Sequence, residues 1–167
     1  MRREIRRQID HLKKLERGLD ERIAQLIERD DSLRSRSEVM RRMLGIGPVV
    51  THTLLCRLPE LGRVNRQSIA ALAGLAPYAN ESGRWRGKRS IFGGRAEVRR
   101  ALYIAAMTAS RCEGPLRRRY QALMDRGKCR KVALIACARH ILIALNARMA
   151  EHLASIEEGH HLARIGA

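Results

Sequence analysis

The residue best placed for chemistry is Ser82, which lies in a segment rich in glycine and arginine between Gly74 and Arg100. This segment has five glycines and seven Lys or Arg residues against two carboxylates. Glycine lets a backbone approach a ligand closely, and arginine donates paired hydrogen bonds to phosphate oxygens. We therefore expect a phosphate-binding surface that includes Gly83, Arg84, Arg86, Gly87, Lys88, Arg89, Arg95, Arg99 and Arg100.

The Ser82 hydroxyl has two chemical roles open to it in such a segment. It either donates a hydrogen bond to a phosphate, or it attacks phosphorus while nearby cations hold the charge of the phosphate oxygens. Residue chemistry alone favours the hydrogen bond. Tyr78 and Tyr103 are the other conceivable nucleophiles, but we expect Tyr103 to lie on the apolar side of a helix and Tyr78 to be a packing residue.

The charge of the chain indicates a polyanionic partner. Net charge is +17 and the sequence pI is about 11.3. Residues 39–150 hold 22 basic and 5 acidic side chains, whereas residues 1–38 hold 11 and 9. The sequence predicts no membrane span, because no apolar run comes near the roughly 18 residues that a span needs. It also predicts no signal peptide. The expected partner is nucleic acid, in the bacterial cytoplasm with the nucleoid, and no membrane is expected.

No metal site or cofactor is expected in this chain. Its four cysteines form no CxxC pair, and we expect them to be buried, reduced thiols. A two-metal nuclease needs clustered carboxylates. In residues 39–150 the carboxylates are well dispersed, at Glu60, Glu81, Glu97, Glu113 and Asp125. Any metal chemistry is therefore expected to come from elsewhere.

Residues 3–44 are predicted to form one long helix. Apolar residues alternate at spacings of three and four, which is typical of a coiled coil, with interruptions at Glu16, Asp30 and Ser37. We assign residues 1–38 to oligomerisation and expect a homo-oligomer. The alternative is an ordinary helix that packs on its own domain.

The next segment, GIGPVVTHTLL, is predicted to form a helix-hairpin-helix. Gly45 and Gly47 make a tight turn, and Pro48 starts a helix whose expected apolar face holds Val49, Val50, Leu54 and Leu55. Such a hairpin directs backbone N–H groups at a phosphate, so Gly45 and Gly47 are candidate DNA-binding residues. The alternative is a helical hairpin that only turns a corner.

The remaining chain predicts a compact all-α domain over residues 39–153. One short helix is capped by Asn65 and stopped by Gly74, and another covers residues 96–110. A third runs from Gly114 to about Arg126, and an apolar helix near residues 132–153 belongs at the centre of the bundle. Residues 90–92 are the one candidate hairpin edge, and residues 154–167 are expected to be a flexible tail.

Three stretches together resemble a known family. They are GIGPVVTHTLL, LGRVNRQSIAALAGLAPYANESGRWRGKRSIFGGRAEVRRALYIAA and GKCRKVALIACARHILIALNA, within residues 38–150. In this order and spacing they resemble the C-terminal transposase domain of the IS110 insertion-sequence family. The resemblance implies that Ser82, in the Ser-Gly pair, is the nucleophile of a covalent DNA–protein intermediate.

The resemblance also implies partners outside this sequence. In the family an N-terminal RuvC-like domain carries a four-carboxylate site for divalent metal, and a structured guide RNA directs recognition. This sequence starts at what resembles the family's connecting coiled coil, so it is expected to be a truncated copy or an isolated domain, and a transposase incomplete without the metal domain. The alternative functions are a non-catalytic DNA- or RNA-binding module, or a transposase remnant.

Overall fold

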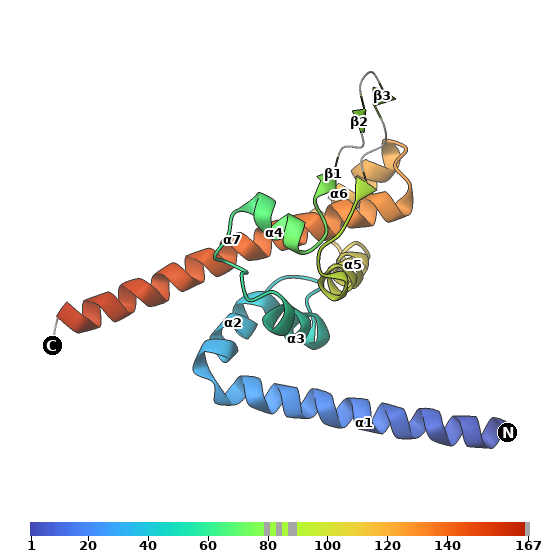
Figure 1. Cartoon of the computed structure of the whole chain (residues 1–167), viewed down its shortest axis with the longest axis horizontal. Coiled ribbons are helices and arrows are strands. Elements are labelled where there is room, and N and C mark those ends of the chain that lie inside the picture. The colour runs from blue at the N-terminus through green and yellow to red at the C-terminus, as the bar shows by residue number, and fades with distance from the viewer. Residues whose placement is uncertain (79–80, 83–84, 87–89, 166–167) are drawn as a thin grey trace.

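The computed structural model describes residues 1–78, 81–82, 85–86 and 90–165, and the side chains of residues 1–78 and 90–158. The described chain is predominantly helical, which confirms the all-α prediction (Figure 1). Four strands of two residues each lie between α4 and α5. The helices are α1 (Arg2–Arg29), α2 (Asp31–Arg41), α3 (Pro48–Arg57), α4 (Arg66–Leu72), α5 (Ala96–Ala109), α6 (Pro115–Asp125) and α7 (Arg130–Ile165).

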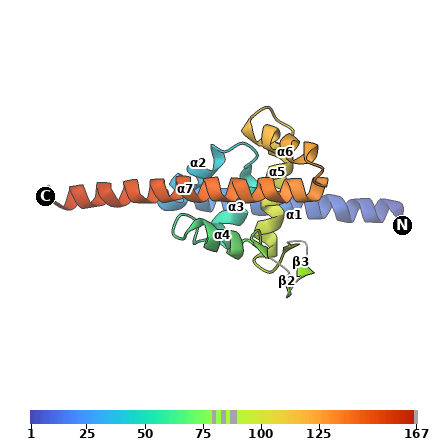
Figure 2. The same ribbon diagram turned by 90° about the horizontal axis from the view of Figure 1, so that it is seen from above.

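Helix α7 is the centre of the helical body, as its apolar sequence predicts. Helices α2, α4, α5 and α6 all contact it, and Figure 2 shows them on both of its sides. Its buried face includes Leu134, Leu142, Leu145 and Met149. The helix continues to Ile165, so the segment expected to be a flexible tail is helical through that residue.

Helix α7 also corrects the expectation that no segment has the length and composition of a membrane span. Residues Arg130–Glu158 meet that criterion. Half of the most apolar window is buried inside the protein, however. The core helix of a helical bundle has the same composition as a span, because it too is surrounded by apolar side chains.

The prediction of one unbroken helix over residues 3–44 is wrong, because the chain breaks at Asp30. Asp30 has an extended backbone (φ −109°, ψ 111°) and both ends α1 and begins α2. Its carboxylate accepts a hydrogen bond from the Leu33 amide at 2.9 Å, which caps α2. In the sequence, Asp30 appears as an interruption of the apolar register. In the structure, one helix ends and the next begins at this residue.

From Asp30 towards its N-terminus, α1 projects away from the body (Figure 1). Only its C-terminal end joins the core, through buried Ile27 and half-buried Ile23. Its other large apolar side chains are about half exposed or more: Ile5, Ile9, Leu12, Leu15, Leu19 and Leu26. The apolar stripe of the predicted coiled coil is thus real, and most of it has no partner within the described chain.

The turn between α2 and α3 is held by close packing at Gly45. This residue has φ +90°, and a Cβ there would lie 2.5 Å from the Ala105 carbonyl oxygen of α5. Pro48 begins α3 as predicted, and Val50, Leu54 and Leu55 are buried. Val49 is 63% exposed, which corrects its placement on the apolar face. Phosphate binding by the turn stays a prediction.

We predict opposite outcomes for two substitutions in this turn. Gly45→Ala should lower the free energy of unfolding by about 2–4 kcal/mol, because it adds a positive-φ penalty to an atomic overlap. Gly47→Ala should cost no more than about 1 kcal/mol, since Gly47 has no neighbouring heavy atom within 4 Å of its Cβ position. Urea unfolding of both variants measures the difference, and equal losses would contradict a packing role for Gly45.

The predicted ends of α4 are confirmed, whereas three of the four cysteines are more exposed than predicted. The Asn65 side chain caps α4, and Gly74 follows its end at φ +65°. Among the cysteines, only Cys137 is buried, and burial raises the pKa of its thiol. Cys56 and Cys129 are exposed and Cys112 is half-buried, so the prediction of four buried thiols is wrong for these three.

Candidate functional site

Within the glycine- and arginine-rich segment, the described residues form two antiparallel strand pairs, and we call residues 77–91 the arm. At its base, β1 (Pro77–Tyr78) pairs with β4 (Ser90–Ile91). Further out, β2 (Glu81–Ser82) pairs with β3 (Trp85–Arg86), with Ser82 opposite Trp85. Figure 1 shows β2 and β3 beyond β1, away from the helical body. The predicted hairpin edge at residues 90–92 is confirmed for Ser90 and Ile91, while Phe92 follows the strand, and Ser82 lies on the outer pair.

Much of the predicted phosphate-binding set lies outside the described residues. This applies to Gly83, Arg84, Gly87, Lys88 and Arg89. For Ser82 and Arg86 the backbone pairing is described and the side chains are not. The roles assigned to these residues therefore stay predictions.

The base of the arm is fixed by direct backbone contact between Gly74 and Gly94. Both have φ +65°. A Cβ at Gly94 would lie 2.5 Å from the Gly74 Cα and would therefore overlap the Gly74 backbone. Beside this contact the Arg95 amide donates to the Leu72 carbonyl at 2.8 Å. Arg99 Nη1 donates to the Gly93 carbonyl at 2.6 Å. The two segments that flank the arm are thereby joined to each other and to α4 and α5.

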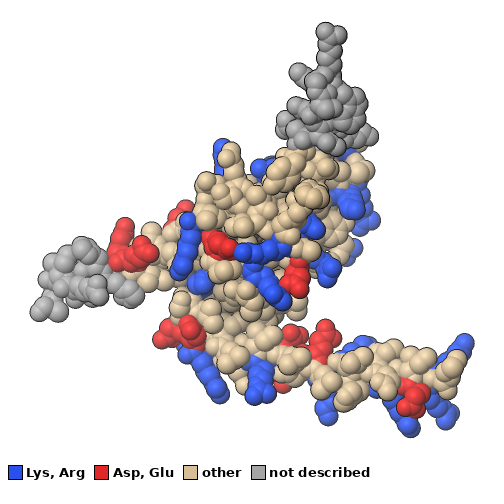
Figure 3. All heavy atoms as spheres, viewed as in Figure 1, with Lys and Arg blue, Asp and Glu red and all other residues tan. Residues whose placement is uncertain are grey.

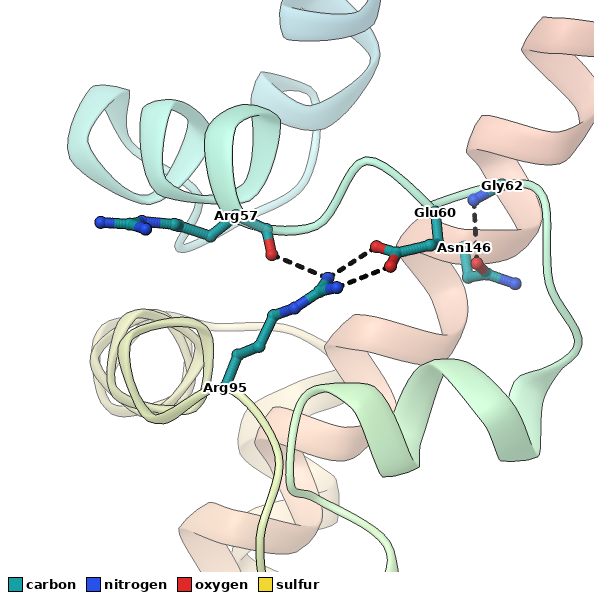
Figure 4. A network of polar contacts seen from close by, with 5 residues as sticks. All are labelled: Arg57, Glu60, Gly62, Arg95 and Asn146. Atoms are coloured by element: carbon teal, nitrogen blue, oxygen red, sulfur yellow. Dashed lines mark hydrogen bonds and ion pairs between the residues drawn. The ribbon is translucent and has the colours of Figure 1, made fainter.

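Arg95, predicted to bind phosphate, is occupied by an ion pair (Figure 4). Its Nη1 and Nη2 each donate to one Glu60 carboxylate oxygen at 2.6 Å. Nη1 also donates to the Arg57 carbonyl at 2.9 Å, at the end of α3. The Arg95 hydrogen bonds lower the pKa of Glu60 to about 2. Arg95 thus fixes the start of α5 to the loop after α3, and phosphate binding would require it to leave Glu60.

The loop that carries Glu60 is in turn held by Asn146, a buried polar residue of α7 (Figure 4). Asn146 Oδ1 accepts from the Gly62 amide at 2.9 Å, and Nδ2 donates to the Val64 carbonyl at 2.8 Å. The sequence indicates no structural role for Asn146, and it shows Glu60 only as one of several dispersed carboxylates. The signal for Asn146 in the sequence is that it is the one amide side chain of a mostly apolar segment, residues 132–153.

Beside the arm lies a cavity of about 700 Å³ that we call the basic groove. Its walls come from the end of β4, the first turns of α5 and the start of α7. Arg99, Arg100 and Lys131 line it together with Phe92 and Tyr103, and none of the described lining residues is a carboxylate. The cavity thus brings Lys131, from a distant part of the sequence, next to Arg99 and Arg100, and phosphate binding by these two arginines stays a prediction.

The charged surface agrees with this arrangement. In Figure 3, Lys and Arg side chains lie over the end of the body that α5, α6 and the start of α7 form. On α6, Arg117, Arg118 and Arg119 are all exposed. Carboxylates and cations are mixed along α1 in the same view. In this view the end of the body that carries the arm is thus more uniformly cationic than α1.

The two tyrosines lie in different surroundings. Tyr103 is half-buried in the basic groove. Tyr78 is 48% exposed at the base of the arm, which corrects its interpretation as a packing residue.

The described residues offer no cluster suited to a metal ion. No three His, Cys, Asp or Glu side chains among them lie close enough together to hold one. A divalent metal in a separate RuvC-like domain stays an expectation from the family resemblance.

Comparison with models of known protein families identifies the family of this chain. Residues 37–121 match the sequence model described as Transposase IS116/IS110/IS902 family. The chain belongs to this transposase family. The match extends from the middle of α2 into α6 and includes the arm, while Lys131 of the basic groove lies beyond it. A search of curated proteins found no match.

We predict that the Glu60–Arg95 ion pair stabilises the family domain in a pH-dependent way. The Glu60 pKa falls from 4.5 to about 2 on folding, so the stabilisation is present above pH 4.5 and is lost as pH falls towards 2. Glu60→Gln should lower the melting temperature at pH 7 by about 2–4 °C. The difference between wild type and variant should shrink below pH 4.5.

Glu97→Gln is the matched control, because Glu97 pairs with Arg57 at 2.9 Å across two largely exposed side chains. Exposed ion pairs contribute little to stability. A pH-independent effect of Glu60→Gln, or an equal effect of Glu97→Gln, would contradict the role assigned to Glu60. Thermal melts followed by circular dichroism between pH 2.5 and 7 give both comparisons.

Proposed function

We propose that this chain is the DNA-binding, serine-bearing domain of a transposase, in which Ser82 breaks and rejoins DNA strands. Family membership supports a transposase-related function. The observation that carries the finer proposal is the arm with the basic groove at its base. A hairpin that bears the Ser-Gly pair extends from the end of the domain where Arg99, Arg100 and Lys131 meet.

The proposed reaction is a phosphoryl transfer. The Ser82 oxygen forms a bond to phosphorus as its proton leaves to a base, and the bond from phosphorus to one sugar oxygen breaks. That sugar oxygen takes up a proton and becomes a free hydroxyl. Reversal of these steps, with a second DNA end supplying the hydroxyl, rejoins the strand. The serine ester keeps the phosphoryl bond, so rejoining needs no outside energy source.

The cations of the domain have a separable task in this proposal. Arg99, Arg100 and Lys131 bind the phosphates on either side of the reacting one and position the strand. The cations predicted in the arm, Arg84, Arg86, Lys88 and Arg89, would neutralise the charge that develops on the reacting phosphate. Since the described residues offer no metal cluster, we assign no step to a metal in this chain.

The other components of the proposal follow from the family resemblance. A RuvC-like domain supplies the divalent metal site, and a structured guide RNA is a second nucleic-acid partner. The expected place of action is the bacterial cytoplasm, at the nucleoid. The metal-bearing domain and the guide RNA are separate from the residues that the structure describes.

We predict that Ser82→Ala removes strand cleavage and leaves DNA affinity within about 1 kcal/mol, the size of one neutral hydrogen bond. The assay uses end-labelled nicked DNA, denaturing gels and peptide mapping of any DNA–protein adduct. If the chain alone gives no turnover, the RuvC-like domain and Mg²⁺ are added. The wild type should form an adduct that maps to Ser82.

Ser90→Ala is the matched control, because Ser90 is a second serine of the same arm, in β4 at its base. It should keep the adduct. An adduct that survives Ser82→Ala, or that maps to Tyr78 or Ser90, would contradict the nucleophile. Binding without an adduct in every condition would instead favour the non-catalytic binding module.

We further propose that α1 joins two copies of the chain into a homo-oligomer. Its apolar stripe is exposed over most of its length, and the body covers only the part near Ile23 and Ile27. A helix with such a stripe buries it against another helix in water. The mixed charges of its flanks are compatible with a close partner of the same sequence.

The double substitution Leu19→Lys and Leu26→Lys should therefore yield monomers in light scattering at about 100 μM. Gln8→Lys with Gln25→Lys adds the same charge at exposed polar positions of α1 and should leave the oligomer intact. A monomeric wild type would contradict the proposal. So would equal effects of the two double variants.

A further inference from the structure

Phe92 is the only phenylalanine of the chain, and it is 78% exposed. It directly follows β4 and lines the basic groove with Arg99, Arg100 and Lys131. Burial of a phenylalanine side chain contributes about 1.5–3 kcal/mol to folding. Its exposure forgoes that gain, so packing within the fold does not explain why an aromatic residue stands here.

The backbone around Phe92 is held in place. On one side Ile91 pairs with Pro77 in the β1–β4 ladder. On the other side the Gly93 carbonyl accepts from Arg99, and Gly94 lies against Gly74. The ring is therefore presented from a fixed point at the edge of the groove. Because the backbone is already ordered, covering the ring costs only the rotamer freedom of the Phe92 side chain.

The chemistry of the groove indicates which partner fits. An aromatic ring offers a face for stacking on a nucleobase, and neighbouring cations bind the flanking phosphates. A volume of about 700 Å³ is within the usual range of small-ligand cavities. In paired, stacked DNA the faces of the bases are covered by their neighbours. A base can lie against Phe92 only after it leaves the stack.

We propose that Phe92 stacks on an unpaired base of the bound DNA, while Arg99, Arg100 and Lys131 hold the phosphates beside it. The inference rests on the proposed DNA binding and adds a preference to it. The domain binds DNA with an unpaired base at the groove more tightly than fully paired DNA. Strand exchange requires such unpaired bases, so the preference directs the domain to opened DNA.

The test measures two affinities for each protein variant. One duplex is fully paired, and the other carries a single extrahelical 2-aminopurine, whose fluorescence is quenched when it stacks on an aromatic ring. Wild-type protein should quench the probe and bind the second duplex more tightly. Phe92→Ala should weaken that binding by about 5- to 150-fold, the range for one lost stacking contact, with less than a twofold change for the paired duplex.

Two further variants separate stacking from structure. Phe92→Trp should restore both the quenching and the affinity for the unpaired base, because indole also stacks. Val49→Ala removes another exposed apolar side chain, 63% accessible on α3 and outside the basic groove, and should change neither affinity. Circular dichroism should show the same helical content in all variants, since both altered side chains are largely exposed.

The outcomes distinguish this inference from the proposed function. If the wild type binds neither duplex, DNA binding itself fails. If it binds both and Phe92→Ala changes neither, or weakens both equally, the stacking inference is overturned while DNA binding stands. A Phe92 dependence seen only with single-stranded RNA of the same sequence would also overturn it, since the partner would then be RNA.

Discussion

The contact on which the site depends is the close approach of Gly74 and Gly94. It joins the two segments that flank the arm. It tolerates no side chain, because a Cβ at Gly94 would overlap the Gly74 backbone and a Cβ at Gly74 would overlap the Gly93 carbonyl oxygen. The contact also brings β4 and Phe92 next to α5, where Arg99 and Arg100 begin the basic groove. A backbone crossing of this kind fixes direction as well as distance, so the hairpin that bears Ser82 extends from a defined point.

The excess of positive charge destabilises the fold and at the same time favours the binding of a polyanion. Residues 39–150 carry 22 basic side chains against 5 acidic ones, so the compact state repels itself. The carboxylates of Glu60, Glu97 and Glu113 each pair with an arginine, and Glu60 does so at the base of the arm. An anionic ligand that binds the folded state would offset the remaining repulsion and stabilise the domain. Binding and folding of this domain should therefore be coupled.

Local signals in the sequence predicted most helices, and long-range contacts account for what they missed. Asn65, Pro48 and Gly74 mark helix ends through interactions within a few residues, which a sequence displays directly. The Glu60–Arg95 pair and the Asn146 hydrogen bonds join residues 35 to 84 positions apart. No local pattern reports such pairs, so the sequence predicts phosphate binding for Arg95 and indicates no role for Asn146. For Ser82, the residues alone left two roles open, and the family resemblance selected one.

A comparison of Gly94→Ala with Gly93→Ala tests most directly whether the backbone crossing fixes the arm. The two glycines have almost the same positive φ, +65° and +66°, but the Cβ position of Gly93 has no heavy atom within 4 Å. Both variants incur the conformational penalty, and only Gly94→Ala adds the overlap with Gly74. Urea unfolding should show that Gly94→Ala loses about 1–3 kcal/mol more than Gly93→Ala. Equal losses would show that the crossing does not hold the arm.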